Sequence, residues 1–238
     1  MVASPAYLAS DADITPVAAL LADTTRAAML TALLDGRALA AGELARLAGV
    51  SAATASSHLA RLLAGGLVTV VSQGRHRYYR LAGHEVAAAL EVLGLLGSRR
   101  PVRSLRESRH AQALSEARTC YDHLAGRAGV TLLDALLGRG ALSAGAQAAD
   151  LDITAEGGAA LAEFGLDISA LRRSRRRLAV SCLDWTERRP HLGGALGAAI
   201  TARLLELGWI ERGTLRRAVQ VTAAGRDRLA ATFGWPDS

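Results

Sequence analysis

The chain has 238 residues, and its 50% hydrophobic content is enough for one large core or two small ones. Its two cysteines, Cys120 and Cys182, exclude a disulfide framework, and no stretch has the pattern of a signal peptide or the apolar length of a bilayer crossing. We therefore expect a cytoplasmic protein with no membrane part. The low aromatic content of 4% favours helices with short strands.

The net charge of +6 is carried by arginine alone and is distributed unevenly. Residues 1–97 are neutral, residues 98–118 carry +4, residues 119–170 carry −5 and residues 171–238 carry +7. Guanidinium groups pair well with phosphate, so we expect the segments at 98–118 and 171–238 to contribute to any attraction to nucleic acid.

The first half of the chain predicts a helix-turn-helix. Residues 15–34 predict two helices, because apolar residues recur at helical spacing. Residues 41–48 predict a short helix that ends at Gly49, and residues 51–64 predict a second helix that begins at Ser51. Its inward face is expected to contain Ala55, Leu59, Leu62 and Leu63.

Two β-strand patterns follow this helix and are separated by a Gln-Gly-Arg turn at residues 73–75. They predict a two-stranded wing from Val68 to Leu81. We expect Tyr78 or Tyr79 to lie in the core.

Four segments of this half carry a family resemblance: LADTTRAAML (21–30), ELARLAGVS (43–51), SHLARL (57–62) and GRHRYYRL (74–81). In this order they resemble the ArsR/SmtB family of transcriptional regulators. The resemblance implies that residues 1–97 form a winged helix-turn-helix domain for DNA binding and dimerisation. It further implies a homodimer on a double-stranded operator at the nucleoid, and repression that an effector relieves. We expect no enzymatic activity, since no catalytic motif appears.

The expected DNA contacts are the polar and basic side chains of the predicted recognition helix and of the wing tip. They are Ser51, Thr54, Ser56, Ser57, His58, Arg61, Arg75, His76 and Arg77. Short hydroxyls approach base edges closely, and arginines at a hairpin tip suit phosphate or minor-groove contact. Ala52 stands where the family often has a polar residue, so we expect backbone contacts to dominate. The alternative is a winged-helix scaffold for protein contacts without DNA binding.

The metal sites of the resembling family are not matched. One of these sites uses cysteines on the first helix of the helix-turn-helix, and residues 41–48 contain none. Another begins with an acid and a histidine on the last helix of the domain, where this chain has His84 and Glu85 but no later ligands. We interpret His84 as a residue of the helix start. The helix at 86–96 has more apolar residues than one face needs, which predicts a dimerisation surface.

The second half contains a duplicated unit. Residues 98–118 form a basic connector, with a helix expected from about residue 104 to 127, and an offset of 68 then aligns copies at about 120–166 and 188–234. Each copy predicts a helix, a glycine stop, two short strands and a closing helix capped by Thr154 or Thr222. The predicted fold is therefore α+β, mainly helical with short hairpins, with a winged helix followed by a tandem of winged-helix-like units over residues 119–238.

This duplicated domain offers two places for an effector. A small molecule would fit a crevice between the copies, although the duplication alternatively only enlarges a dimer scaffold. Cys120 and His123 would share a face if their segment is helical, and Cys182 and His191 add a second pair. These side chains predict a soft or transition metal site or a thiol-redox sensor, against the alternative of inert packing cysteines and histidines at helix starts.

Two further features of the second half carry predictions. The arginine run at 172–177 is interpreted as a solvated helix face or as a clamp on flanking DNA. Trp185, Trp209 and Trp235 are expected to anchor the second copy.

Overall fold

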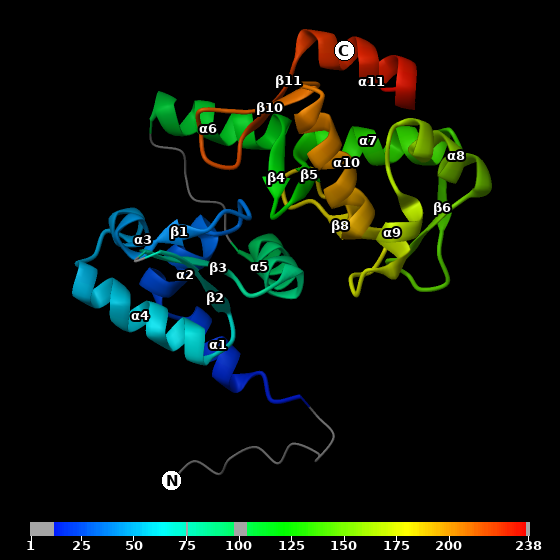
Figure 1. Ribbon diagram of the computed structural model, residues 1–238. Helices are drawn as coiled ribbons and strands as arrows, with labels where there is room; N and C mark the ends of the chain where they lie inside the picture. Colours follow the sequence, from blue (N-terminus) through cyan, green and yellow to red (C-terminus); the bar gives the residue numbers. More distant parts are fainter. Residues whose placement is uncertain (1–11, 75, 98–103, 237–238) are drawn as a thin grey trace. The chain divides into compact units, whose positions relative to one another are not determined.

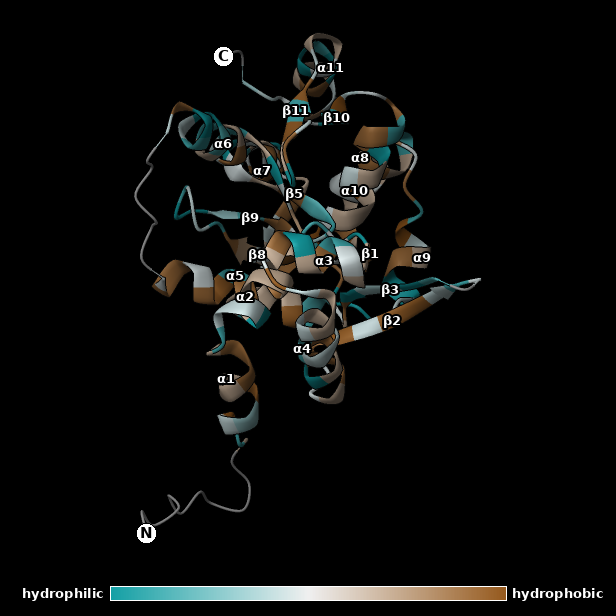
Figure 2. Ribbon diagram, turned by 90° about the vertical axis from the view of Figure 1, so that its left-hand side faces the viewer, coloured by the Kyte–Doolittle hydropathy of each residue, from teal (hydrophilic) through white to brown (hydrophobic). Residues whose placement is uncertain are grey.

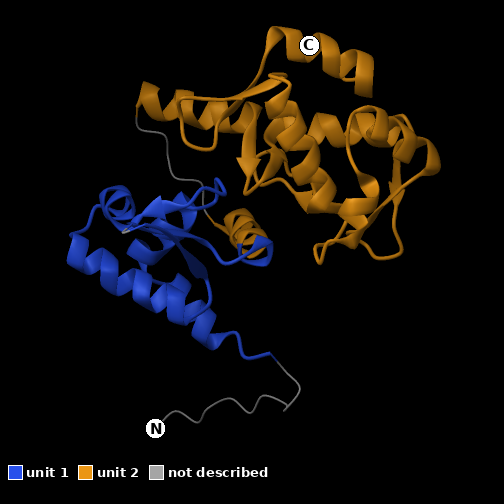
Figure 3. Cartoon of the chain, in the orientation of Figure 1, with its two compact units in different colours: residues 1–86 blue, residues 87–238 orange. Residues whose placement is uncertain are grey.

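The computed structural model describes residues 12–74, 76–97 and 104–236 (Figure 1). The predicted DNA contact Arg75 and three of the six arginines of the basic connector lie outside these residues. The chain divides into two compact units, residues 1–86 and 87–238 (Figure 3). Helices alternate with short antiparallel hairpins, which confirms the predicted α+β class. Within the described ranges, no helix combines the length and the apolar character that a membrane span needs.

The first unit is a winged helix-turn-helix. Its elements are α1 (Thr15–Leu21), α2 (Thr24–Ala32), β1 (Leu39–Ala40), α3 (Ala41–Ala48), α4 (Ala52–Ala64), β2 (Val68–Gln73) and β3 (His76–Leu81). Helix α3 ends at Gly49, whose φ of 67° is readily adopted by glycine, and the Ser51 side chain caps α4 by accepting from the Thr54 amide. The wing strands pair antiparallel, and β1 pairs with the other edge of β3. The predicted helices and wing are confirmed.

The core of this unit lies under α4. Ala55, Leu59 and Leu62 are fully buried as predicted, and Tyr79 of β3 is also buried. The expectation for Leu63 was wrong, because its side chain is 38% exposed. Successive residues of a helix turn by about 100°, which carries Leu63 past the edge of the buried face that Leu59 and Leu62 form.

The second unit begins within helix α5 (His84–Leu96) and is built from hairpins and helices. Its further elements are α6 (Leu105–Glu116), β4 (Arg118–Cys120), β5 (His123–Ala125), α7 (Gly126–Gly138), β6 (Leu142–Ala144), β7 (Leu151–Ile153), α8 (Ala155–Glu163), α9 (Ile168–Arg173), β8 (Val180–Leu183), β9 (Pro190–Gly193), α10 (Gly194–Glu206), β10 (Ile210–Arg212), β11 (Val219–Val221) and α11 (Ala223–Phe233). Each of its sheets is a two-stranded antiparallel hairpin.

The helix expected from residue 104 to 127 was wrong in its second half. Helix α6 ends at Glu116, and the hairpin β4–β5 follows. The extended backbone is held by distant partners, since the Thr119 amide donates to the Arg217 carbonyl at 2.9 Å. Local helical spacing does not reveal such a partner.

The elements of the duplicated unit recur at the predicted offset. Strand β5 corresponds to β9, α7 to α10, the hairpin β6–β7 to β10–β11, and α8 to α11. The hydroxyls of Thr154 and Thr222 both cap their helices, accepting from Gly157 and Gly225 amides at 2.9 Å. Both predicted caps are therefore confirmed. The first strand of each copy, β5 or β9, also pairs with a preceding strand, β4 or β8, in a hairpin that the sequence did not predict.

The two copies interlock crosswise around one core. Helix α7 of the first copy packs on β9 of the second, and α10 of the second packs on β5 of the first. Strand β4 lies beside β11, and bridges join Arg118 to Ala218 and Asp150 to Val180. Buried leucines and isoleucines of both α7 and α10 contribute to a single cluster. Neither copy can therefore bury its apolar surface without the other.

Glycine at position 129 of α7 permits this close packing and gives a stability prediction. A Cβ there would collide with the Leu124 carbonyl and lie 3.3 Å from the Cβ of His191. We expect Gly129→Ala to lower the free energy of unfolding by about 1–3 kcal/mol, because backbone has to move. Gly138→Ala in the same helix meets open space and should raise it by about 0.5–1 kcal/mol. Chemical denaturation measures both, and equal effects would contradict the argument.

Candidate functional site

The exposed face of α4 presents short polar groups and one cation. Thr54, Ser57 and Arg61 are exposed and recur at spacings of three and four, so they share one face of the helix. Ser56 is exposed on another flank. The Ser51 hydroxyl lies 2.9 Å from the Thr54 hydroxyl and caps the helix, so its first role is structural.

His58 occupies a different environment from the other predicted contacts of α4. Its Nδ1 lies 3.5 Å from Asp23 Oδ1 and 3.4 Å from Arg26 Nη1, and its side chain is 17% exposed. Asp23 also caps α2 through the Arg26 amide, which lowers the pKa of the Asp23 carboxyl. His58 is therefore placed to fix α4 against α2 more than to contact a base.

Arg26 is a structural residue that the sequence did not single out. It is buried and donates from Nε to the Leu20 carbonyl at 2.7 Å and from Nη2 to the Ala19 carbonyl at 2.9 Å. These bonds satisfy carbonyl groups at the end of α1. Its sequence signals are its position three residues after the capping Asp23 and its place in the segment 21–30 that carries the family resemblance.

The wing carries exposed cationic and aromatic side chains. His76 pairs with Gln73 next to the hairpin turn, and both His76 and Arg77 are exposed. The guanidinium of Arg77 lies 6.0 Å from the ring centre of Tyr79, the residue that anchors this strand in the core. Arg77 and Arg61 thus give the first unit exposed cations on both the helix and the wing.

The second unit gathers the remaining predicted site residues into one buried group, here called the Cys/His cluster. It consists of Cys120, His123, Cys182 and His191, whose ligand atoms all lie within 4.8 Å of one another. The two sulfur atoms are 4.0 Å apart, and the two imidazole rings stack with centres 5.1 Å apart. The predicted helical face for the first pair was wrong, because Cys120 and His123 lie on paired strands instead.

Two aspartates stand beside the imidazoles of the cluster. Asp122 Oδ1 lies 3.2 Å from Nδ1 of His123, and Asp184 Oδ2 lies 3.5 Å from Nδ1 of His191. Burial by itself lowers the pKa of His123, but Cys120 and Asp122 outweigh it and raise this pKa to about 9. Burial raises the pKa of the Asp122 carboxyl, but His123 and Arg176 outweigh it and hold this pKa well below its usual range.

The thiol of Cys120 is poorly suited to act as a nucleophile. Its hydrogen bond with Cys182 and its burial raise its pKa to about 12, so the sulfur is protonated at neutral pH. Reactive cysteines have lowered pKa values and access to solvent, whereas Cys120 is only 1% exposed. This environment disfavours the thiol-redox interpretation.

The comparisons with known proteins bear on both halves of the chain. Residues 21–71 match the family described as a helix-turn-helix domain. The chain is 42% identical to the uncharacterised HTH-type transcriptional regulator YdfF of Bacillus subtilis over 216 residues, which cover 90% of this chain and 94% of YdfF. The chain belongs to the ArsR-type winged-helix transcriptional regulators. It is a DNA-binding regulator.

Further relatives of this regulator match a smaller share of the chain. The HTH-type transcriptional regulator CmtR of Mycobacterium tuberculosis is 43% identical over 73 residues, or 31% of this chain and 61% of CmtR. The solved structure of HlyU from Vibrio cholerae is 33% identical and covers 34% of this chain and 88% of HlyU, with a TM-score of 0.32.

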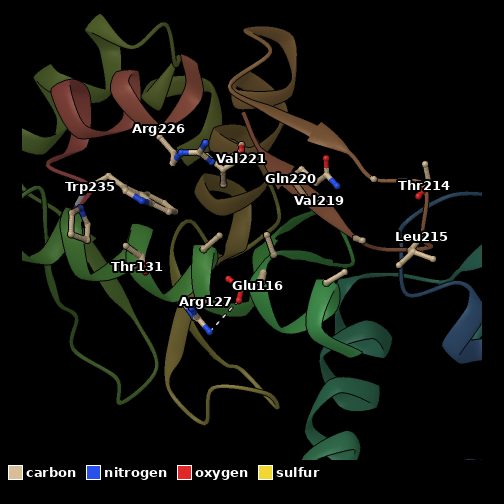
Figure 4. A pocket seen from close by; sticks show the side chains of 16 residues that line it. Glu116, Arg127, Thr131, Thr214, Leu215, Val219, Gln220, Val221, Arg226 and Trp235 are labelled. Atoms are coloured by element: carbon tan, nitrogen blue, oxygen red, sulfur yellow. Dashed lines mark hydrogen bonds and ion pairs between the residues drawn. The ribbon is translucent and has the colours of Figure 1, made fainter. Parts of the chain in front are cut away.

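The regulator also has a cavity of about 730 Å³ in its second unit. It lies between α6 and α7 on one side and the β10–β11 hairpin on the other, where the sequence predicts a crevice between the copies. Figure 4 shows the Glu116–Arg127 ion pair on one wall and Arg226 and Trp235 on another. Its walls are mixed in polarity and would suit a small organic molecule.

Several arginines of the run at 172–177 have partners within the second unit. Arg176 pairs with Asp122 at 2.5 Å, and Arg177 pairs with Asp150. Helix α9 contains only the first two arginines of the run. A single solvated helix face therefore does not describe the whole segment.

The three tryptophans occupy different positions in the second unit. Trp185 lies against the guanidinium of Arg118 at 4.7 Å, Trp209 contacts Phe164, and Trp235 packs on the shared core.

Proposed function

We propose that this regulator is a homodimeric repressor that binds a two-fold operator in the cytoplasm and is released by an effector bound in its second unit. The observation that carries DNA binding is the exposed polar and cationic face of α4 beside the exposed Arg77 of the wing. Helix N-termini and hydroxyls position a protein on phosphates, while arginines supply salt-dependent affinity. Ala53, which lies between Thr54 and the capping residue of α4, has no polar side chain. Few side chains in the first turn of α4 are therefore available for direct base contacts.

Dimerisation is supported by an apolar stripe on α5. Ala89, Val92, Leu93 and Leu96 recur at helical spacing and are all exposed, with Val92 53% and Leu96 81% exposed. Figure 2 shows hydrophobic residues along much of this helix. Exposed leucines at this spacing are typical of a helix that packs against a partner. In a two-fold dimer the α5 helices of the two protomers would pack together, so that each apolar stripe is buried against the other.

A buried ion pair supports communication between the second unit and α5. Arg217 pairs with Glu91 of α5, and both side chains are at least nine-tenths buried. Arg217 also donates from Nε to the Thr119 carbonyl at 3.0 Å, next to Cys120 of the Cys/His cluster. An effector that moves β4 therefore has a direct mechanical connection to the proposed dimer helix.

Replacement of the exposed arginines tests DNA binding. Fluorescence anisotropy with duplex DNA from upstream of the regulator's own gene is expected to show salt-dependent binding. Arg61→Ala and Arg77→Ala should each weaken it roughly 10-fold and reduce the slope of log K against log salt by about 1. Arg212→Ala removes another exposed arginine, from β10 of the second unit, and should leave both quantities unchanged.

Two outcomes would contradict this proposal. One is wild-type protein that shows no salt-dependent binding to this DNA. The other is an Arg212→Ala variant that weakens binding as much as Arg61→Ala, which would mean that only net charge matters.

A further inference from the structure

The Cys/His cluster is built by two hairpins of the same design. Cys120 on β4 stands directly opposite His123 on β5, and Cys182 on β8 stands directly opposite His191 on β9. Opposite residues of an antiparallel pair have neighbouring side chains. Each hairpin thus supplies one thiol and one imidazole, and β5 of the first copy lies against β9 of the second.

The spacing of the four ligand atoms suits a tetrahedral ion. Zinc bonds of about 2.3 Å to sulfur and about 2.0–2.1 Å to nitrogen imply separations of roughly 3.3–3.8 Å between ligand atoms in a tetrahedron. The two sulfurs of the cluster are 4.0 Å apart, and all four ligand atoms lie within 4.8 Å. Small side-chain rotations would bring them to bonding distance.

The surroundings of the cluster provide what a metal site needs around its ligands. A ligating histidine commonly directs its other ring nitrogen toward a carboxylate, and Asp122 and Asp184 each lie beside an Nδ1 here. His191 is fully buried, and neither of its ring nitrogens has a hydrogen-bond partner among the described residues. Burial of such a group without a partner is costly, and a metal bond to Nε2 would compensate for it.

A disulfide explains the cluster less well. It requires a sulfur separation of about 2.05 Å, whereas the two sulfurs are 4.0 Å apart. It would also use two of the four groups and leave Nε2 of His191 buried without a hydrogen-bond partner among the described residues.

We propose that the Cys/His cluster binds one zinc-class divalent cation with tetrahedral geometry and thereby fastens the two copies together. The two thiols and the protonated His123 imidazole release their protons to solvent, and the resulting two thiolates with two neutral imidazoles balance the charge of the ion. Sites with four protein ligands are closed and contribute to folding, so the ion stabilises the second unit. Metal binding by the cluster can be tested independently of DNA binding, because the metal content of the protein is measured directly.

The test uses untagged full-length protein. Elemental analysis after gel filtration is expected to find one zinc per chain, and cobalt should give thiolate charge-transfer and tetrahedral d–d absorption. Cys182→Ser and His191→Ala should lose at least nine-tenths of the bound metal, while His84→Ala at the start of α5 retains it. Zinc at about 1000 times its Kd should raise the Tm of the metal-free wild type on the order of 10 °C and leave Cys182→Ser unchanged.

Circular dichroism shows whether the variants are folded. If a variant is unfolded, the cobalt spectrum of the wild type still reports the geometry of the site. The proposal is overturned if the wild type retains no metal on gel filtration, if octahedral cobalt spectra appear, or if folded Cys182→Ser retains as much metal as the wild type. A wild type that forms the Cys120–Cys182 disulfide in air and binds no zinc after reduction also overturns it.

Discussion

Leu93→Glu is expected to convert the regulator from a dimer to a monomer and to weaken operator binding about 100-fold, because a monomer engages only one half-site. Leu93 lies in the exposed apolar stripe of α5 and is 44% exposed in the chain. In a two-fold dimer the substitution would place two carboxylates in one apolar contact, where burial of unpaired charge is costly. Sedimentation equilibrium measures the association, and anisotropy with a two-fold operator measures the binding.

Leu137→Glu provides the matched control for this prediction. Leu137 is 39% exposed on α7, outside the stripe, and its replacement adds the same charge. This variant should remain dimeric and bind DNA as the wild type does. A Leu93→Glu protein that is still dimeric at the same concentrations would remove α5 as the dimer contact.

Arg118→Met is expected to lower the free energy of unfolding by about 3–5 kcal/mol, which is the largest stability effect we predict. Arg118 and Asp184 form an ion pair at 2.9 Å, and neither side chain is exposed. Burial raises the pKa of the Asp184 carboxyl, but Arg118 and several hydrogen bonds outweigh it and hold this pKa well below its usual range. Methionine would leave that carboxylate buried without its counter-charge.

Arg189→Met is the corresponding control at an exposed ion pair. Arg189 and Asp134 also lie 2.9 Å apart, but their side chains are 60% and 47% exposed. Loss of this ion pair should lower the free energy of unfolding by less than about 1 kcal/mol, since water already solvates both charges. Chemical denaturation compares the two variants, and equal losses of stability would show that burial does not decide the strength of these pairs.

The regulator's first unit was largely predictable because its signals are local. Gly49 ends one helix, Ser51 caps the next, and a glycine turn separates the wing strands, so each boundary depends on residues within a few positions. The burial of Leu59 followed from the same helical period. Exposure of Leu63 and the contact of His58 with Asp23 depend on how α4 sits against α2, and periodicity does not determine that.

In the second unit, local structure could be predicted from the sequence, whereas strand pairing could not. The offset of 68 identified the repeated helices and the caps at Thr154 and Thr222, because duplicated residues keep the same local structure. The hairpin β4–β5 escaped prediction, since the other edge of β4 is held by a hydrogen bond from the Thr119 amide to the Arg217 carbonyl, 98 residues further along the chain. Strand pairing of this kind is decided by long-range contacts.

The sequence by itself determined the winged helix-turn-helix, the duplication and the residue types available for a metal. Only the tertiary structure decided that those residues meet. Two residues separate Cys120 from His123 and eight separate Cys182 from His191, so no common spacing links the pairs. Cross-strand pairing makes both pairs equivalent, and the crosswise packing of the copies brings them together. Apolar burial shared by both copies, rather than any local signal, places these four side chains in one group.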